Sequence, residues 1–132
     1  MKVFFDHNMS PALARALREL FKDQHEIAIL GEKFKRNATD VEWITELSRE
    51  GRWLVLSEDR RITRNHAEYA AFRNSRLVGI FLARAVHKAP VIKKMERILA
   101  VWPALEVLSE TVEGGAMFEL PIKGVRVRQL KS

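Results

Sequence analysis

The sequence predicts an α/β domain with a mostly parallel sheet and an antiparallel edge at the C-terminal end of the chain. Short apolar segments alternate with amphipathic segments of helical spacing, and this alternation is typical of βαβ units. Residues 53–57 and 77–82 are almost continuously apolar, as are strands buried on both faces of a parallel sheet. Two short strand candidates near the C-terminus flank a turn at 121–124, and they predict a terminal hairpin.

Cap residues delimit two expected helices in the N-terminal half. Ser10 is a good N-cap, and Pro11 after it suits the first helical position. The next helix opens at Thr39, and Gly51 is well placed to end it. The expected strands of this half are Lys2–Phe5, 27–30 and Trp53–Ser57. The first helix is expected to reach about residue 22, and residues 32–38 are expected to form a polar loop.

The C-terminal half is expected to continue the alternation and to end in short strands. A helix over 60–74 leads to the strand at 77–82. Pro90 lies near the first turn of a further helix, which runs to about Trp102. Three strand candidates follow, at 105–108, 116–120 and 125–130. We therefore expect one domain over residues 1–132, without a linker or an internal repeat.

The composition excludes several classes of protein. The 132-residue chain has no cysteine, which excludes disulfides, thiolate metal sites and a cysteine nucleophile. Its apolar stretches fall far short of the roughly 20 residues that cross a bilayer. The N-terminus meets the acid Asp6 at once and does not resemble a secretory signal peptide. We expect a cytoplasmic protein.

The positive charge of the chain favours a polyanionic partner. Lys and Arg total 23 against 17 acidic residues, which gives a formal net charge of +6. Such an excess promotes association with nucleic acids or other polyanions. The basic residues occur in groups, and any one group could be a solvated helix face. The group Arg60, Arg61 and Arg64 adjoins the acid Asp59, and we expect this group to bind nucleic acid.

Three aspartates follow an expected strand or open an expected helix. Asp6 comes after the first strand, Asp59 comes after the third, and Asp40 lies in the first turn of a helix. The carboxyl ends of parallel strands border one crevice, so these carboxylates can converge there. Converging carboxylates without a histidine or cysteine cluster suit a hard divalent cation, Mg²⁺ or Mn²⁺. A metal held in this way in a basic chain indicates phosphodiester chemistry.

The aspartates also have structural explanations. Asp6 could be a turn residue, and Asp59 could cap the helix that follows it. Asp40 would be favoured by the helix dipole without any metal. Thr39 and Glu42 fit a capping box, in which each side chain binds the backbone N–H of the other residue.

Four further polar residues could support the site. Asn8 could hold Asp6 or a metal-bound water, and the hydroxyl of Ser57 could bind a water or the metal. Glu58 and Asp59 are adjacent, so one of them must point away from the crevice. The possible supporting residues are Asn8, Glu42, Ser57 and Glu58.

Three ordered segments make the sequence resemble the PIN-like domains, and specifically the small branch that includes the VapC-type toxins. The segments are FDHNMSPALA at 5–14, TDVEW at 39–43 and VLSEDRRI at 55–62. The resemblance implies a three-layer α/β/α fold with Asp6, Asp40 and Asp59 as catalytic and metal-binding acids. Many PIN nucleases carry a fourth acid shortly after the third. The next acid here, Glu68, falls within an expected helix, so the choice between one and two metal ions stays open.

The resemblance implies a Mg²⁺- or Mn²⁺-dependent endoribonuclease of a toxin–antitoxin system. The metal would activate water, and basic residues would hold the phosphates of RNA. The expected partners are RNA, a small antitoxin protein that covers the acidic crevice, and a second copy of the chain in a homodimer. One alternative is a non-catalytic PIN-like module that binds nucleic acid or protein. Another is a phosphoacceptor domain of the receiver type, which normally shows two adjacent acids near its first strand.

Overall fold

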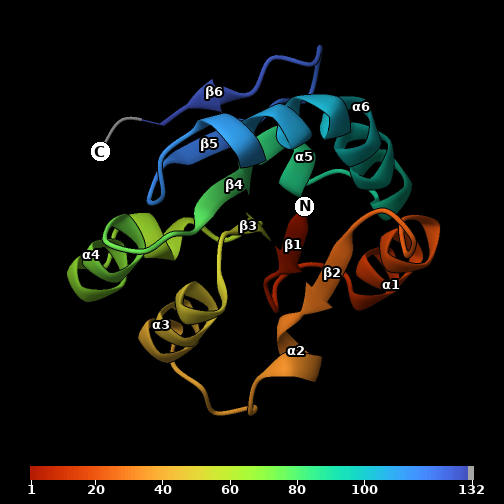
Figure 1. Cartoon of the computed structure of the whole chain (residues 1–132). Helices are drawn as coiled ribbons and strands as arrows, with labels where there is room; N and C mark the ends of the chain where they lie inside the picture. The colour runs from red at the N-terminus through yellow and green to blue at the C-terminus, as the bar shows by residue number, and fades with distance from the viewer. Residues whose placement is uncertain (131–132) are drawn as a thin grey trace.

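In residues 1–130, which the computed structural model describes, six strands form one sheet (Figure 1). Their order is β2-β1-β3-β4-β5-β6; the first five strands are parallel to their neighbours, and β6 pairs antiparallel with β5. The strands are β1 Lys2–Phe5, β2 Glu26–Ile29, β3 Trp53–Ser57, β4 Val78–Leu82, β5 Met117–Leu120 and β6 Arg128–Gln129. The predicted parallel sheet with an antiparallel C-terminal edge is confirmed.

Helices cover both faces of the sheet and complete the predicted three layers (Figure 1). The longer helices are α1 Pro11–Leu20, α3 Asp40–Glu50, α4 His66–Arg73 and α6 Val91–Thr111. The short ones are α2 Leu30–Lys33, α5 Arg84–His87 and the 3₁₀ helix η1 Arg60–Thr63. Buried side chains of α1 and α6 pack on one face of the sheet, and those of α3 and α4 pack on the other. The sheet is therefore the middle layer.

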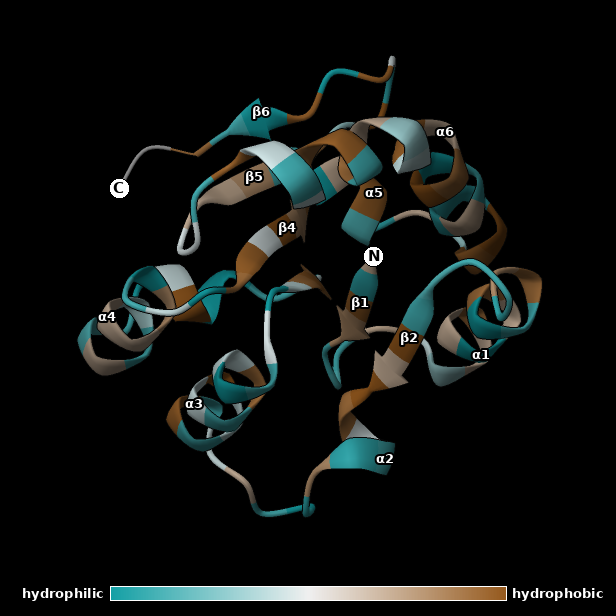
Figure 2. Cartoon of the chain, viewed as in Figure 1, coloured by the Kyte–Doolittle hydropathy of each residue, from teal (hydrophilic) through white to brown (hydrophobic). Residues whose placement is uncertain are grey.

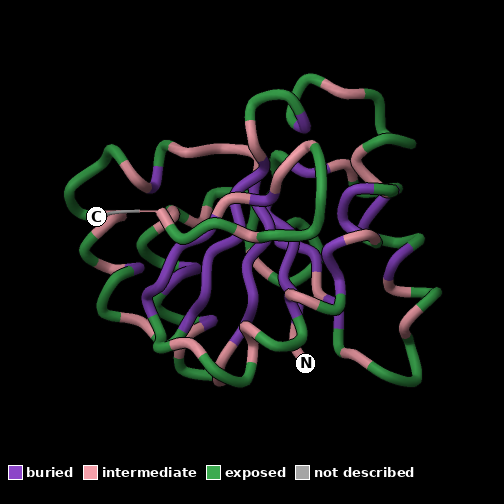
Figure 3. Tube along the Cα trace, turned by 90° about the horizontal axis from the view of Figure 1, so that it is seen from above, coloured by how far each residue is buried: buried purple, intermediate pink, exposed green. Residues whose placement is uncertain are grey.

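The alternation of side chains along each strand divides the interior into two cores. In β1, Val3 and Phe5 face the layer of α1 and α6, whereas Phe4 faces the layer of α3 and α4. All residues of β3 are buried, as its apolar sequence predicts. The central strands are accordingly largely brown in Figure 2 and purple in Figure 3.

The predicted caps are present. Ser10 Oγ accepts a hydrogen bond from the backbone N–H of Leu13 at 3.3 Å, and Thr39 Oγ1 accepts one from Glu42 at 3.1 Å. Gly51 ends α3 with a φ of 144°, in a region that favours glycine. These contacts fix where α1 and α3 begin and where α3 ends.

The expected strand at 105–108 is wrong, because α6 continues through Pro103 to Thr111. An interior proline costs about 3 kcal/mol in a helix, but the buried stripe on the sheet side keeps its helical spacing across it. The stripe consists of Ile98, Val101, Trp102 and Leu105. Packing of this stripe offsets the cost of the proline.

Neither α6 nor another helix in residues 1–130 combines the length and the apolar character that a membrane span requires.

The expected helix over 60–74 is two shorter helices, η1 and α4. The break arises because Asn65 caps α4: its Oδ1 accepts a hydrogen bond from the backbone N–H of Glu68 at 3.1 Å. Glu68 consequently lies in the first turn of a helix and not in the middle of one. Smaller differences are that α1 ends at Leu20, that α2 enters the expected loop, and that α5 has no counterpart among the expected helices.

Gly79 lets α4 approach the sheet closely. A Cβ at this position would lie 2.8 Å from Cε2 of Phe81 and 3.1 Å from Cζ of Phe72, and both rings are fully buried. We expect Gly79→Ala to lower the free energy of unfolding by about 2 kcal/mol, because the crowded core must rearrange around the added methyl group. Urea denaturation measures this change. Gly31→Ala is the matched control, since nothing lies within 4 Å of its Cβ position. Equal stability of the two variants would contradict the close packing of α4.

Candidate functional site

Four acids from four segments approach the carboxyl edge of the sheet. Asp6 and Asp59 follow the adjacent parallel strands β1 and β3. Asp40 opens α3, and Glu68 lies in the first turn of α4. Burial is the main cause of the raised pKa values of Asp6 and Glu68. The charge of Asp40 raises both further, and the charge of Asp59 adds to the effect at Glu68. The sheet edge therefore carries concentrated negative charge.

Asp6 is a buried carboxylate with fixed hydrogen bonds. Only 3% of the residue is exposed. Ser57 Oγ donates to Asp6 Oδ2 at 2.8 Å, and the backbone N–H of His7 donates to Oδ1 at 2.6 Å. Burial raises the pKa of Asp6 above its ordinary value, although the bond from Ser57 and the charge of His7 act in the opposite direction. A cation near Asp6 would stabilise its ionised form.

Asp59 is held by three donors. Its Oδ1 accepts a hydrogen bond from the backbone N–H of Arg61 at 2.8 Å, which caps η1. Its Oδ2 accepts one from Asn8 Nδ2 at 3.0 Å and forms an ion pair with the Arg61 guanidinium. Partial burial alone would raise the pKa of Asp59, but the hydrogen bonds and the charge of Arg61 outweigh it and lower the pKa. Asp59 therefore has the expected capping role and keeps its charge at the crevice.

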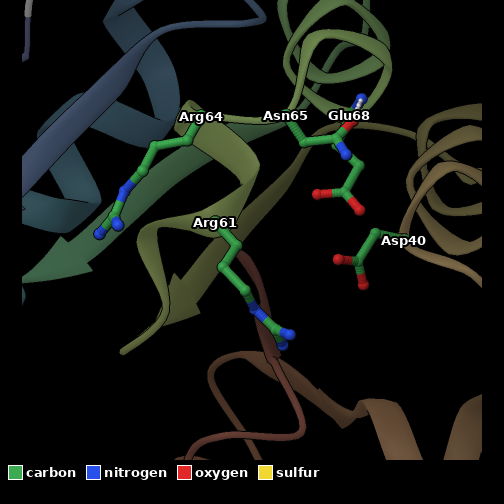
Figure 4. A pocket seen from close by; sticks show the side chains of 5 residues that line it. All are labelled: Asp40, Arg61, Arg64, Asn65 and Glu68. Carbon is green, nitrogen blue, oxygen red and sulfur yellow. Dashed lines mark hydrogen bonds between the residues drawn. The ribbon is translucent and has the colours of Figure 1, made fainter.

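Asp40 and Glu68 form a pair of facing carboxylates (Figure 4). Trp43 Nε1 donates to Asp40 Oδ1 at 2.8 Å, which fixes this side chain at the start of α3. Burial and the charge of Asp40 raise the pKa of Glu68. The pair lines a cavity of about 360 Å³ together with Arg61, Arg64 and Asn65. This pair is a place where a proton or a cation would be favourably held.

Glu68 was not expected at the site, because the sequence favoured one uninterrupted helix over its position. The signal that could have identified it is Asn65 followed three residues later by Glu68, a pattern typical of a helix start. A helix that starts at the sheet edge carries the residues of its first turn there.

The four residues that were expected to support the site do not all lie at the acidic crevice. Ser57 is buried; its hydroxyl donates to Asp6 and accepts from the backbone N–H of Asp59 at 3.0 Å. Asn8 holds Asp59 and not Asp6. Glu58, the next residue after Ser57, turns to the opposite side, where Lys94 and His87 pair with it. Glu42 is exposed on α3.

The three arginines that were expected to bind nucleic acid have different partners. Arg60 pairs with Glu119 of β5, and Arg61 pairs with Asp59. Arg64 lines the cavity of Asp40 and Glu68, but its guanidinium points away from both acids (Figure 4). Arg61 and Arg64 thus border the acidic crevice, and Arg61 lies closest to its acids, whereas Arg60 is directed to Glu119.

The donor chemistry of the site fits a hard divalent cation. The four acids offer carboxylate oxygens, the ligands that Mg²⁺ and Mn²⁺ prefer. As the side chains stand in residues 1–130, no three His, Cys, Asp or Glu residues are grouped closely enough to hold an ion. The guanidinium of Arg61 binds Asp59 and is also attracted by Asp40 and Glu68. An ion that enters would therefore compete with Arg61 for Asp59.

One comparison with known proteins gives a match. A family model described as a PIN like domain matches residues 1–84. This segment covers β1 to β4 and contains all four acids of the crevice. No curated protein and no solved structure matches the chain.

The buried Asp6 predicts a specific dependence of stability on pH. Folding raises the pKa of Asp6 above its ordinary value of 3.8. At a pH between these two values, Asp6 is more often protonated in the folded chain than in the unfolded chain. The contribution of Asp6 to stability consequently falls as pH rises through this window. We expect Asp6→Asn to gain stability over the parent as pH rises above 3.8, and the gain to level off above the raised pKa.

Urea denaturation of both proteins across pH, without divalent ions, measures this difference. Asp23→Asn is the matched control, because Asp23 is an exposed residue between α1 and β2, and its curve should follow that of the parent. A constant difference between Asp6→Asn and the parent across the pH range would contradict a raised pKa.

Proposed function

Because the chain belongs to the PIN-like domain family, we propose that it is a Mg²⁺- or Mn²⁺-dependent endoribonuclease. The observation that carries the proposal is the approach of Asp6, Asp40, Asp59 and Glu68 to one edge of the sheet, beside arginines. Clustered carboxylates next to guanidinium groups suit the hydrolysis of a phosphodiester, in which a cation and basic side chains offset the charge of the phosphate.

In this mechanism Asp6, Asp40 and Asp59 would hold the cation, with Glu68 beside Asp40 as the fourth acid. A divalent ion supplies Lewis-acid chemistry, since it acidifies a water and offsets charge on the leaving oxygen. Ser57 and Asn8 hold Asp6 and Asp59 in place through their hydrogen bonds. Glu68, whose pKa is raised by burial and by Asp40, is suited to take up or release a proton at its carboxylate.

The arginines of the site would bind the substrate. Arg64 borders the cavity of Asp40 and Glu68, and Arg61 lies at its rim. If a cation replaced Arg61 at Asp59, the Arg61 guanidinium would be free to bind a phosphate, because guanidinium groups bind phosphates and carboxylates alike. Binding through such contacts weakens strongly with salt. RNA is proposed as the substrate because of the family resemblance.

We also propose that the domain acts in a toxin–antitoxin type system in the cytoplasm. The support is electrostatic: the buried Asp6 and the pair of Asp40 and Glu68 are crowded carboxylates, and a nearby positive charge stabilises their ionised forms. A small antitoxin protein could supply that charge through a Lys or Arg side chain in the crevice and so exclude the metal.

A second candidate function is that of a non-catalytic PIN-like module that binds nucleic acid or protein. The observation that favours it is Arg61, which already neutralises Asp59 where an ion would bind. In this case the acids would serve as caps and as contacts for a partner. The two functions differ in whether the protein binds a divalent ion.

Removal of a proposed metal ligand should abolish cleavage. We expect Asp6→Asn and Asp59→Asn to reduce Mn²⁺-dependent cleavage of labelled RNA by about 100-fold or more. Mutation of an outer-shell partner of a metal ligand already costs about 10- to 100-fold in activity, and removal of the charge of a ligand itself costs more. Titration calorimetry should show Mn²⁺ binding by the parent and by the control Asp23→Asn, but not by Asp6→Asn. Cleavage at the parental rate by Asp6→Asn or Asp59→Asn would overturn the mechanism. A parent that binds no divalent ion would favour the non-catalytic module.

Removal of Arg61 should separate metal binding from RNA binding. We expect Arg61→Gln to bind Mn²⁺ several-fold more tightly, because a competing cation is lost from Asp59. The same variant should bind single-stranded RNA more weakly, since a phosphate contact is lost. Calorimetry and fluorescence anisotropy measure the two affinities. Arg15→Gln, which removes an exposed arginine of α1, should change neither. If both affinities fall in Arg61→Gln, Arg61 does not compete with the metal.

A further inference from the structure

A second cavity adjoins the acidic crevice on the far side of Asp59. It has a volume of about 530 Å³ and lies over the carboxyl ends of β3, β4 and β5. Its lining includes Arg60 and Arg64 from the η1 segment, Arg84 and His87 from α5, and Glu119 from β5. We refer to this cavity as the α5 pocket. Its volume is in the range of small-ligand sites.

The acids of the α5 pocket are already paired with cations. The pairs are Glu58 with Lys94, Glu119 with Arg60 and Arg128, and Asp59 with Arg61. The side chain of Glu58 is only 5% exposed, and His87 Nδ1 lies 3.4 Å from the same Oε1 that pairs with Lys94. The negative charge of these acids is therefore largely neutralised within the protein.

Two arginines of the pocket remain available to a ligand. Within residues 1–130, Arg64 and Arg84 form no ion pair with a carboxylate within 4.0 Å. Both are exposed, and the guanidinium of Arg64 points away from Asp40 and Glu68 (Figure 4). These two unpaired guanidinium groups, beside acids that are already paired, make the pocket positive. Guanidinium groups bind phosphates in a bidentate geometry, so a phosphate suits this pocket.

The α5 pocket shares lining residues with the cavities of the acidic crevice. Arg64 lines both the α5 pocket and the cavity of Asp40 and Glu68. Asp59 lines the α5 pocket and also the cavity that contains Asn8 and Arg61. A chain with regularly spaced phosphates can therefore lie across both sites, with one phosphate at the acids and another at the arginines. A single small anion would occupy only one of the two cavities.

We propose that the α5 pocket binds a phosphate of the RNA substrate, at a nucleotide beyond the one that is cleaved, through Arg84 and Arg64. The inference rests on the proposed ribonuclease function and adds to it the direction of the substrate: the strand leaves the acids along the ends of β3 and β4, toward α5. Arg84 is a binding residue in this arrangement and takes no part in the hydrolysis.

Binding of a short, fluorescently labelled single-stranded RNA without divalent ions tests the proposal, because no metal-dependent cleavage then occurs. We expect Arg84→Gln to weaken binding about tenfold, the effect of one charge-assisted contact. We also expect the slope of log affinity against log salt to become shallower by about 0.7, the value for one phosphate contact on a single strand. Arg84→Lys keeps the charge and should restore most of the slope.

The matched control is Arg15→Gln, which changes the net charge equally but lies on α1. It should leave affinity and slope unchanged. If Arg84→Gln binds RNA with the affinity and the salt dependence of the parent, the proposal is overturned. If Arg84→Gln and Arg15→Gln lose RNA affinity equally, the effect is one of net charge, and the proposal is also overturned. In cleavage assays with Mn²⁺, Arg84→Gln should raise KM and leave kcat nearly unchanged.

The outcomes also distinguish this proposal from the ribonuclease proposal. If the parent binds RNA through Arg84 but cleaves none with any divalent ion, the ribonuclease function fails and the phosphate site stands as part of a binding module. If the parent cleaves RNA and Arg84→Gln binds and cleaves as the parent does, the α5 pocket proposal fails alone.

Discussion

The parallel register of β1 and β3 is the constraint on which the site depends. Phe5 lies opposite Leu56, and the backbone N–H of Asp6 donates to the carbonyl of Leu56 at 3.1 Å. Asp6 therefore stands beside Ser57, and its carboxylate accepts the Ser57 hydroxyl. Alternation along β1 turns the side chain of Asp6 to the same side as Phe4, toward the layer of α3 and α4. These helices carry Asp40 and Glu68. A shift of one residue in the register would direct Asp6 to the other layer and separate the acids.

Electrostatic balance then determines what the crevice can bind. Three of the four acids at the carboxyl edge have a partner that lowers the free-energy cost of their charge: a hydroxyl and a histidine at Asp6, an indole at Asp40, and an arginine at Asp59. Glu68 faces Asp40 and has the raised pKa of a carboxylate next to a like charge. Glu58, the residue directly before Asp59, faces the opposite layer and is neutralised there by Lys94. The two residues that follow β3 thus contribute to different sites. Asp59 belongs to the acidic crevice, and Glu58 lines the α5 pocket.

The sequence was sufficient for much of the fold, because apolar strands and cap residues are local signals. Ser10, Thr39 and Gly51 act where their chemistry predicts. Residues 105–108 were expected to form a strand after a helix that ends near Trp102, whereas tertiary packing of the buried stripe carries α6 past Pro103. The positions of Asp6, Asp40 and Asp59 at one edge follow from topology, but Glu68 depended on the break between η1 and α4. The pairing of Arg61 with Asp59, and of Glu58 with Lys94, depends on side-chain orientations and on segments distant in the chain, which no local pattern specifies.

The ion pair of Arg61 with Asp59 has a consequence for how the protein is made. Small metal-dependent domains often cannot fold until their ion arrives, because uncompensated ligands oppose the folded state. Here the chain carries its own substitute charge, and two cores on either side of the sheet provide the stability. Folding of this chain therefore does not require a divalent ion. Under the proposed function, the supply of the ion, or of a cationic competitor for the same carboxylates, would set how many of the folded molecules are active.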